Sequence, residues 1–399
     1  MKLYNFDEII DRNGTACVKY DGMADAFPGK EGLLPLWVAD MDFRTPDFIL
    51  DAIKKRCEHP VMGYTFSDDS YWDSILTWLK YKYVWEAKKE WLTYIPGIVK
   101  GIGFVVQCFT KPGDKVIIQP PVYHPFRIVP ESMKRQVVYN PLKEEEGGYS
   151  MDFENLESVI DEDCKLLILS NPHNPGGIVW HKEDLARLAE ICAKHHILVV
   201  SDEIHAEMTY PAFRHHPFAT VSGTAADCSI TFMAPSKTFN IAGIVSSYAI
   251  VPNRQIREQF FEFLEAGELN HGTIFAYTAT TAAYTYGAEW LQQMRTYVVE
   301  NVNYVENYLK VNIPQIKIVR PQASFLIWLD CRGLGLDQPG LVSLFEDKAK
   351  LALNNGAMFG PGGEGHMRLN IGCPRSVLVK AMEALKKAVA DYRRLGVSS

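Results

Sequence analysis

The chain has 399 residues, which is enough for two or three domains. Hydrophobic residues make up 47% and charged residues 22%, a composition that excludes a disordered, collagenous or coiled-coil protein. The net charge is -7 and no basic run accompanies it, so nothing in the sequence would neutralise a row of phosphates, and we expect no nucleic-acid partner.

The first residues mix charged and apolar side chains and lack the continuous apolar core of a signal peptide. No stretch approaches the roughly 18 apolar residues of a membrane span. The eight cysteines are scattered without a C-x-x-C pair, which is typical of reduced core residues. We therefore expect a cytoplasmic protein with no membrane partner.

The first well-defined element that the sequence predicts is a helix at Pro46–Glu58. From about residue 95 to 255, short apolar runs alternate with segments of helical period, which predicts an α/β fold with a largely parallel sheet covered on both faces. A covering helix is expected over residues 181–196, where apolar side chains recur at helical spacing. The strand candidates are Lys115–Gln119, Gln136–Tyr139, Lys165–Ser170, Ile197–Ser201, Ser229–Met233 and Ser247–Val251.

The C-terminal part predicts a smaller α+β domain. Its expected elements are a helix at Glu289–Val311, a strand at Ser324–Asp330, a helix at Gln338–Asn354, a strand at His366–Ile371 and a helix at Ser376–Arg394. The residues that precede the first good helix are too few to fold alone, so they join this domain or a partner subunit. We expect a large domain over residues 45–285 and a small domain made of residues 1–44 and 286–399.

A loop rich in proline and glycine, Ser170–Gly177, directly follows one predicted strand. Its composition forces a turn at the carboxyl end of the sheet, where α/β proteins bind ligands. Asn174 in this loop can donate a side-chain hydrogen bond to a bound ring. On its own, the loop is equally compatible with a plain turn.

Two further strand ends carry ionisable side chains. Asp202 ends an apolar strand. In such poorly solvated surroundings, a carboxylate can keep a neighbouring nitrogen protonated, because separating the two charges is costly. A helix cap or an exposed surface acid is the alternative interpretation. Lys237 follows the next strand in a turn of small residues, and burial can lower the pKa of a lysine until it becomes a Schiff-base nucleophile, although most lysines are solvated surface charges. The order of Asn174, Asp202 and Lys237, each at a strand end, favours a shared functional site.

These motifs in this order resemble the fold-type I enzymes that use pyridoxal phosphate, in particular the aminotransferase class I and II superfamily. The resemblance implies a large domain with a mostly parallel seven-stranded sheet and a smaller α+β domain. It also implies that Lys237 carries the pyridoxal 5'-phosphate, that Asp202 binds its pyridine nitrogen, and that Asn174 binds its phenolic oxygen and contributes to the substrate site. A protonated pyridine ring stabilises negative charge at the substrate Cα.

Further segments agree with this resemblance. Residues 94–101 open a helix that is expected to run to about Phe109, and the free N–H groups at a helix start attract a phosphate. We expect the backbone of Ile98, Val99 and Lys100 to cradle it. Tyr123 resembles the aromatic residue that lies over the cofactor ring, with simple packing as the alternative.

Arg368 resembles the arginine that clamps the substrate α-carboxylate in this superfamily. The planar fork of a guanidinium suits a carboxylate, because two parallel hydrogen bonds form. A buried structural ion pair is the competing interpretation of the same residue.

The resemblance is closer to one branch, the cystathionine β-lyases and cysteine C–S lyases of the MalY, PatB and cystalysin group. Four segments carry it: PLWVADMDF at residues 35–43, the Gly63–Tyr64 pair, SDEIH at residues 201–205 and APSKTFNIAG at residues 234–243. The resemblance implies that Ala39 contacts the substrate. It also implies a homodimer in which Tyr64 reaches the cofactor phosphate of the neighbouring subunit.

Two positions depart from ordinary aminotransferases. Val245 stands where many of them carry an arginine that pairs with the phosphate, so we expect neutral donors such as Ser236 and Tyr64 to contribute more. His205 stands where a tyrosine is common, and this histidine either contacts the cofactor or fixes Asp202.

The activity that this branch implies is β-elimination from a small amino acid such as cystathionine or cysteine, with release of a thiol, pyruvate and ammonia. Lys237 would act as the general base at Cα, and Tyr64 or Tyr123 would protonate the departing sulfur. An aminotransferase acting on an L-amino acid and a 2-oxo acid is the main alternative. A regulator that binds a protein partner is a more distant one.

Two other cofactor classes are not supported by the sequence. No G-x-G-x-x-G follows the first predicted strand, which disfavours a nicotinamide dehydrogenase. The pairs His195–His196 and His215–His216 are adjacent in sequence, a spacing that points the ring nitrogens apart. We therefore predict no metal site.

Overall fold

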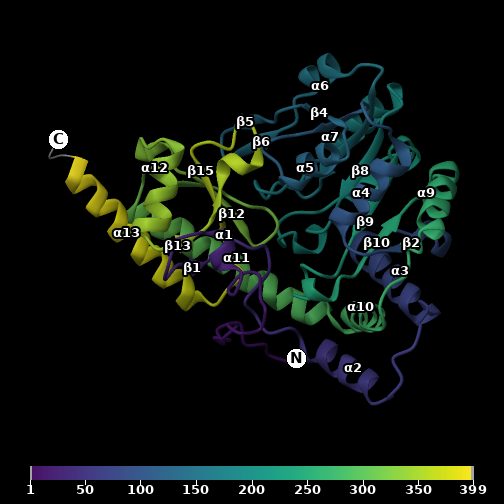
Figure 1. Ribbon diagram of the computed structural model, residues 1–399, viewed down its shortest axis with the longest axis horizontal. Helices are drawn as coiled ribbons and strands as arrows, with labels where there is room; N and C mark the ends of the chain where they lie inside the picture. The colour runs from purple at the N-terminus through teal and green to yellow at the C-terminus, as the bar shows by residue number, and fades with distance from the viewer. Residues whose placement is uncertain (1, 397–399) are drawn as a thin grey trace.

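The computed structural model describes residues 2–396, and a seven-stranded sheet lies at the centre of its larger lobe (Figure 1). In spatial order the strands are β2 (Leu92–Ile95), β10 (Ser247–Ile250), β9 (Ser229–Met233), β8 (Leu198–Asp202), β7 (Cys164–Ser170), β3 (Lys115–Ile118) and β4 (Gln136–Tyr139). The five strands from β9 to β4 run parallel, and β10 is antiparallel to both of its neighbours. The predicted fold class, with a mostly parallel sheet of seven strands, is confirmed.

Helices cover both faces of this sheet, because successive side chains of a strand point to opposite faces. Val116 and Ile118 belong to one apolar cluster, whereas Ile117 between them belongs to another. The first cluster is covered by α4 (Ile98–Phe109), α5 (Pro125–Ser132) and α9 (Arg254–Ala266). The second is covered by α6 (Phe153–Val159), α7 (Lys182–Lys194) and α8 (Gly223–Asp227).

Three more helices complete the larger lobe next to β2 and β10. They are α2 (Asp47–Cys57), α3 (Asp69–Tyr83) and α10 (Ile274–Tyr286). Trp78 of α3 stacks on Tyr284 of α10, with ring centroids 5.0 Å apart, and both rings share a cluster with Tyr248 of β10. This packing anchors the helices to the antiparallel end of the sheet.

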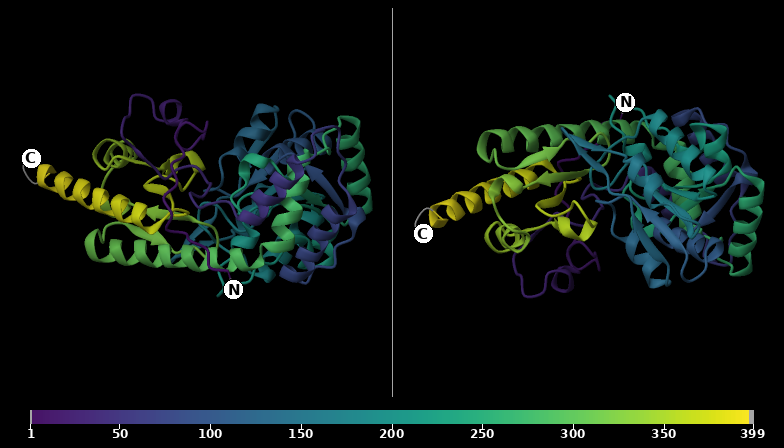
Figure 2. Two further views of the ribbon diagram at one scale, coloured as in Figure 1. Left: turned by 90° about the horizontal axis from the view of Figure 1, so that it is seen from below. Right: turned by 90° about the horizontal axis from the view of Figure 1, so that it is seen from above.

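The smaller lobe is built on a four-stranded antiparallel sheet (Figure 2). Its strands in order are β11 (Lys317–Val319), β12 (Leu326–Asp330), β15 (His366–Asn370) and β14 (Asn354–Asn355). Two long helices, α11 (Ala288–Asn312) and α13 (Arg375–Gly396), pack in the same apolar cluster as β12 and β15. A hairpin of β5 (Lys143–Glu145) and β6 (Gly148–Ser150) extends from the larger lobe.

Two predicted elements differ from the structure. The helix expected over Gln338–Asn354 is wrong beyond its first turns, because α12 (Gln338–Ser343) passes into a π-helical turn at Leu344–Lys348 and then into β13 (Leu351–Ala352) and β14. Lys350 has a φ of +56°, which ends the helix, and strand pairing outweighs the helical pattern here. The helix expected to open at residue 94 begins at Ile98, because the preceding residues form β2.

The N-terminal segment runs between the two lobes. After a short helix, α1 (Met23–Ala26), it forms β1 (Leu34–Pro35), which pairs in parallel with β13. The exact division into two domains stays a prediction. No helix within residues 2–396 is long and apolar enough to cross a membrane.

Gly177, in the loop that carries Asn174, gives the first testable prediction. Its φ is +68°, and an added Cβ would lie 2.6 Å from the Cβ of Pro321. Gly177→Ala should therefore lower the free energy of unfolding by about 1–3 kcal/mol, through backbone strain and overpacking. Gly223→Ala is the control, because a Cβ there meets nothing within 4 Å. Urea denaturation measures both, and equal stability of the two variants would contradict the prediction.

Candidate active site

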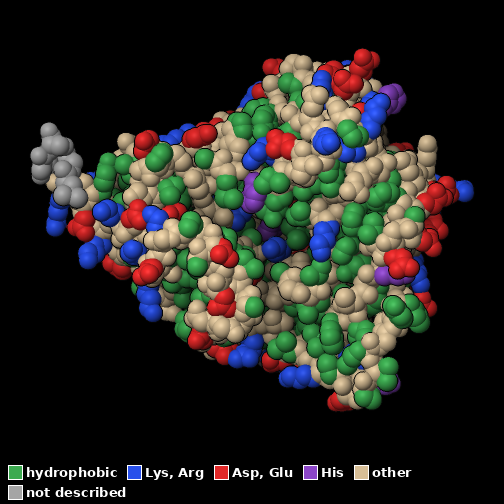
Figure 3. Space-filling view, viewed as in Figure 1, with side chains coloured by type: hydrophobic (Ala, Val, Ile, Leu, Met, Phe, Trp, Pro, Cys, Tyr) green, Lys and Arg blue, Asp and Glu red, His purple; other side chains and the backbone are tan. Residues whose placement is uncertain are grey.

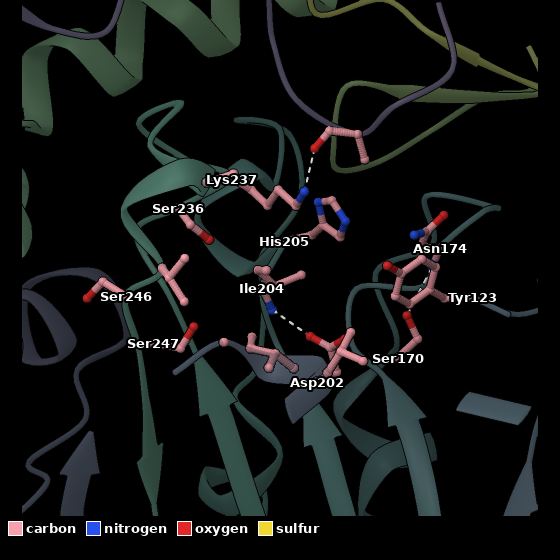
Figure 4. Close-up of a pocket in the computed structure, with 16 residues that line it drawn as sticks. Tyr123, Ser170, Asn174, Asp202, Ile204, His205, Ser236, Lys237, Ser246 and Ser247 are labelled. Carbon is pink, nitrogen blue, oxygen red and sulfur yellow. Dashed lines mark hydrogen bonds between the residues drawn. The ribbon is translucent and has the colours of Figure 1, made fainter. Parts of the chain in front are cut away.

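A cavity of about 200 Å³ lies at the carboxyl end of the large sheet, where β7, β8 and β9 end side by side (Figure 4). Figure 3 shows that this face of the molecule is hollowed near its middle. Nine of the residues predicted from the sequence line the cavity: Ala39, Ile98, Val99, Tyr123, Asn174, Asp202, His205, Ser236 and Lys237. The structure therefore brings together segments that lie up to 198 residues apart, as in the bond between Lys237 and Ala39.

Lys237 is a buried amine with a perturbed pKa. Its Nζ donates to the carbonyl oxygen of Ala39 at 2.5 Å. Its pKa is lowered to about 8, chiefly by burial and also by the nearby Arg368, whereas Asp40 and Asp202 act in the opposite direction. A lysine with this pKa is partly neutral near physiological pH and can act as a nucleophile or a base.

Asp202 ends β8 at the floor of the cavity and is 8% exposed. Its Oδ1 accepts a hydrogen bond from the backbone N–H of Ile204 at 3.1 Å. Burial raises the pKa of this carboxyl to about 7, because the charged form loses its solvation. A protonated nitrogen bound beside it would restore the ionised form and would itself stay protonated.

Asn174 and Tyr123 lie together on the opposite side of the cavity from Lys237 (Figure 4). The backbone N–H of Tyr123 donates to the carbonyl of Asn174 at 3.1 Å, and the Asn174 N–H donates to Oγ of Ser170 at 3.1 Å. The side-chain oxygen of Asn174 accepts from Arg368 at 3.2 Å. The side-chain nitrogen of Asn174 is then the part of its amide that is left to donate to a ligand.

Arg368 lies in β15, contacts Asn174 and is 4% exposed, but it does not itself line the cavity. Its guanidinium donates to Asn174, to the carbonyl of Trp37 at 3.1 Å and to Oδ1 of Asn354 at 2.5 Å, while its Nε has no partner. Within residues 2–396 no carboxylate pairs with it, so a structural ion pair is the wrong interpretation. A buried guanidinium without a counter-charge is costly, and burial lowers its pKa to about 10. The arrangement suits an incoming anion.

The start of helix α4 faces the cavity. Gly97, with a φ of +103°, precedes the helix, and its backbone lines the cavity together with Ile98 and Val99. The side chain of Lys100 is exposed, and Lys100 does not line the cavity. The N–H groups at this helix start can therefore bind an anion. Ile98 and Val99 line the cavity as expected, together with Gly97, and the contact predicted for the Lys100 backbone stays a prediction.

Several functional positions escaped the sequence analysis. The residues that line the cavity without having been predicted include Gly97, Ser170, Ile204, Ser246 and Ser247. Ser246 and Ser247 directly follow Val245, the position at which an arginine is absent. The sequence feature that could have identified this part of the cavity is the pair of hydroxyl side chains, Ser246 and Ser247, where β10 begins.

His205 lies beside Lys237 (Figure 4) and is 4% exposed. Its Nδ1 is buried without a hydrogen-bond partner. Burial lowers its pKa to about 3, and the charges of Lys237 and Arg368 contribute to the same shift. The imidazole is therefore neutral, and it presents an unused polar atom in the region of the cavity.

Tyr64 does not line this cavity in the single chain. Its side chain is fully exposed, and it borders a separate hollow together with Phe66, His271 and Phe275. The predicted contact between Tyr64 and a neighbouring subunit stays a prediction.

Comparisons with known proteins agree with this geometry. The family model for aminotransferase class I and II matches residues 32–385. The chain is 43% identical over 387 residues to cystathionine beta-lyase PatB of Bacillus subtilis, an alignment that covers 97% of this chain and 100% of PatB. It is 32% identical to protein MalY of Escherichia coli, over 98% of this chain and 100% of MalY.

Among solved structures, cystalysin from Treponema denticola, which contains a pyridoxal 5'-phosphate cofactor, superimposes with a TM-score of 0.94. The two chains are 34% identical, and the match covers 98% of this chain and 100% of cystalysin. The chain belongs to the aminotransferase class I and II family. The resemblance to this family inferred from the sequence motifs is confirmed.

The pKa of Lys237 gives a prediction that requires no substrate. In the ligand-free protein, reductive methylation of Lys237 should increase as the pH rises through about 8, because the neutral amine is the reactive form. Asp40→Asn should move the midpoint to lower pH, since Asp40 favours the protonated amine. Arg368→Met should move it to higher pH. Peptide mapping across a pH series gives the midpoints, and shifts of the same sign in both variants would contradict the electrostatic account.

Proposed function

We propose that this protein is a pyridoxal-phosphate-dependent C–S β-lyase that converts a cysteine-type amino acid, such as cystathionine or cysteine, into a thiol, pyruvate and ammonia. One observation carries the proposal: a lysine amine with a lowered pKa and a strand-end aspartate line one cavity, and a buried arginine without a carboxylate partner contacts Asn174 of the same cavity. The name of PatB, a cystathionine beta-lyase, supports the same activity, and the cofactor of cystalysin supports the same cofactor.

The residues around the cavity fit pyridoxal 5'-phosphate. Lys237 would bond to its aldehyde carbon, and Asp202 would pair with its ring nitrogen. The Nδ1 atom of His205, which is buried and has no hydrogen-bond partner, would be free to contact the same group. The helix start at Gly97 and the hydroxyl of Ser236 would hold its phosphate without an arginine. When bound, this group supplies an electron-withdrawing ring conjugated to the substrate Cα.

The chain's own residues bind and orient the substrate. Arg368 would receive the α-carboxylate through its fork, because its charge has no other counter-ion. This contact fixes the orientation of the Cα–H bond toward Lys237, a positioning effect that accelerates the reaction. Asn174 connects the cofactor cavity to the proposed carboxylate site, because Asn174 lines the cavity and its side-chain oxygen accepts a hydrogen bond from the guanidinium of Arg368.

Lys237 would move the proton. Once displaced by the substrate amine, its Nζ is partly neutral near pH 8, because its pKa is lowered to about 8, and the neutral form would take the Cα proton as general base. The Cβ–S bond then breaks, and the sulfur leaves with the bonding electron pair. Tyr123, which lines the cavity, or Tyr64 of a second subunit would protonate the thiolate. Water completes the conversion of the remaining three-carbon fragment to pyruvate and ammonia.

The decisive experiment incubates the purified protein separately with L-cystathionine, L-cysteine and L-alanine. We expect free thiol and pyruvate from the two sulfur substrates. Lys237→Ala should reduce thiol release by about a thousandfold or more. Lys100→Ala is the matched control, because that lysine is exposed and does not line the cavity. Conversion of the cofactor to its amine form without thiol release would instead favour an aminotransferase.

We also propose a homodimer whose subunits complete each other's sites. The loop around Tyr64 exposes large apolar side chains, with Val61 62%, Met62 50% and Phe66 82% exposed. Such a patch favours burial against another surface. A second copy of the chain that covers the loop would bring Tyr64 to the partner's phosphate site.

The dimer leads to a prediction about Tyr64. Analytical ultracentrifugation should give twice the mass of one chain. Tyr64→Ala should weaken retention of the cofactor by roughly tenfold, the usual effect of losing a hydrogen bond to a charged group. Tyr81→Ala, which removes another exposed tyrosine, serves as the control. A monomeric protein with full cofactor affinity would rule out the shared site.

A further inference from the structure

Asn354 lies directly opposite Arg368 in the small antiparallel sheet. The two residues are register partners in the pairing of β14 with β15, and the side chains of such a pair stand on the same face of a sheet. Oδ1 of Asn354 accepts from Nη2 of Arg368 at 2.5 Å, the shortest of the three hydrogen bonds that this guanidinium donates. Strand pairing therefore places an amide oxygen against the arginine.

The amide of Asn354 has a fixed orientation. Its Nδ2 donates to Sδ of Met358 at 3.6 Å, so Oδ1 is the atom that faces the guanidinium. On another side, the ring centroid of Phe359 lies 5.1 Å from Cζ of Arg368, within the range of a cation–π interaction. The guanidinium is held by an amide and an aromatic ring, and neither of them carries a charge.

The absence of charge at position 354 has a chemical consequence. An aspartate there would form a buried ion pair with Arg368, and an incoming carboxylate would have to compete with it. Asn354 instead fixes the orientation of the Arg368 guanidinium and leaves the positive charge of that guanidinium uncompensated. Nε of Arg368 also has no partner, so the guanidinium retains a donor for an anion.

We propose that Asn354 is a positioning residue that aligns Arg368 for the α-carboxylate of the substrate without neutralising it. The inference rests on the proposed function, in which Arg368 binds that carboxylate. It follows that Asn354 governs the binding of amino acids but not of amines that lack the carboxylate.

The test compares L-alanine with ethylamine, which has the same amine and methyl group but no carboxylate. Dissociation constants for the holoprotein are measured from the absorbance of the bound cofactor, for the wild type, Asn354→Ala and Asn354→Asp. Asn355→Ala is the matched control on the same strand, because Asn355 contacts Ala357 and Gln338 instead of Arg368. We expect both Asn354 variants to weaken L-alanine binding by roughly tenfold or more. Ethylamine binding should change less than about twofold.

With a sulfur substrate, the Asn354 variants should raise KM more than they lower kcat, since the residue acts on binding through Arg368. Unchanged L-alanine affinity in Asn354→Asp would overturn the inference. Equal weakening of L-alanine and ethylamine would also overturn it, because that result indicates general distortion of the site. If the wild type itself did not respond to L-alanine, the proposed function and the inference would both fail.

Discussion

The site depends on one short stretch of backbone, Trp37–Met41, that joins the two lobes at the cavity. The carbonyl of Trp37 accepts from Arg368 of the small sheet, and the carbonyl of Ala39, two residues on, accepts from Lys237 of the large sheet. The guanidinium of Arg368 and the amine of Lys237 are thereby fixed relative to each other through the few covalent bonds between Trp37 and Ala39. A segment that is too short to fold alone therefore sets the spacing between Arg368 and Lys237.

Buried charges hold that stretch in place. Arg12 donates to the carboxylates of Asp40 and Asp42, and the fully buried amine of Lys19 pairs with Asp42 at 2.7 Å. Asn370, two residues after Arg368, donates to the carbonyls of Val38 and Asp40. Breaking such a buried pair leaves an uncompensated charge and is strongly destabilising. The position of Trp37–Met41 is therefore maintained by ion pairs and hydrogen bonds, together with the burial of Met41 in the apolar cluster that includes β12 and β15.

Local patterns predicted the parts of the site that follow strands. Asn174, Asp202 and Lys237 each end an apolar run, so the geometry of a parallel sheet is sufficient to bring them together. Asn354 was placed inside a predicted helix, and no local signal could reveal it, because its role arises from pairing with a strand that follows it in sequence. The exact start of α4 was equally hidden, since the short strand β2 merges with the apolar pattern of the helix.

The ionisable groups in and next to the cavity suit ligands that bring charges complementary to their own. Arg368 is buried without an acid, Asp202 is buried with a raised pKa, and Lys237 is held partly neutral by the same burial. Each of these groups is destabilised in isolation, and each is relieved by a complementary charge. Under the proposed function, a group with a protonated ring nitrogen and a substrate with an α-carboxylate would supply the two charges that relieve Asp202 and Arg368, and binding energy would thereby be directed to the atoms that react.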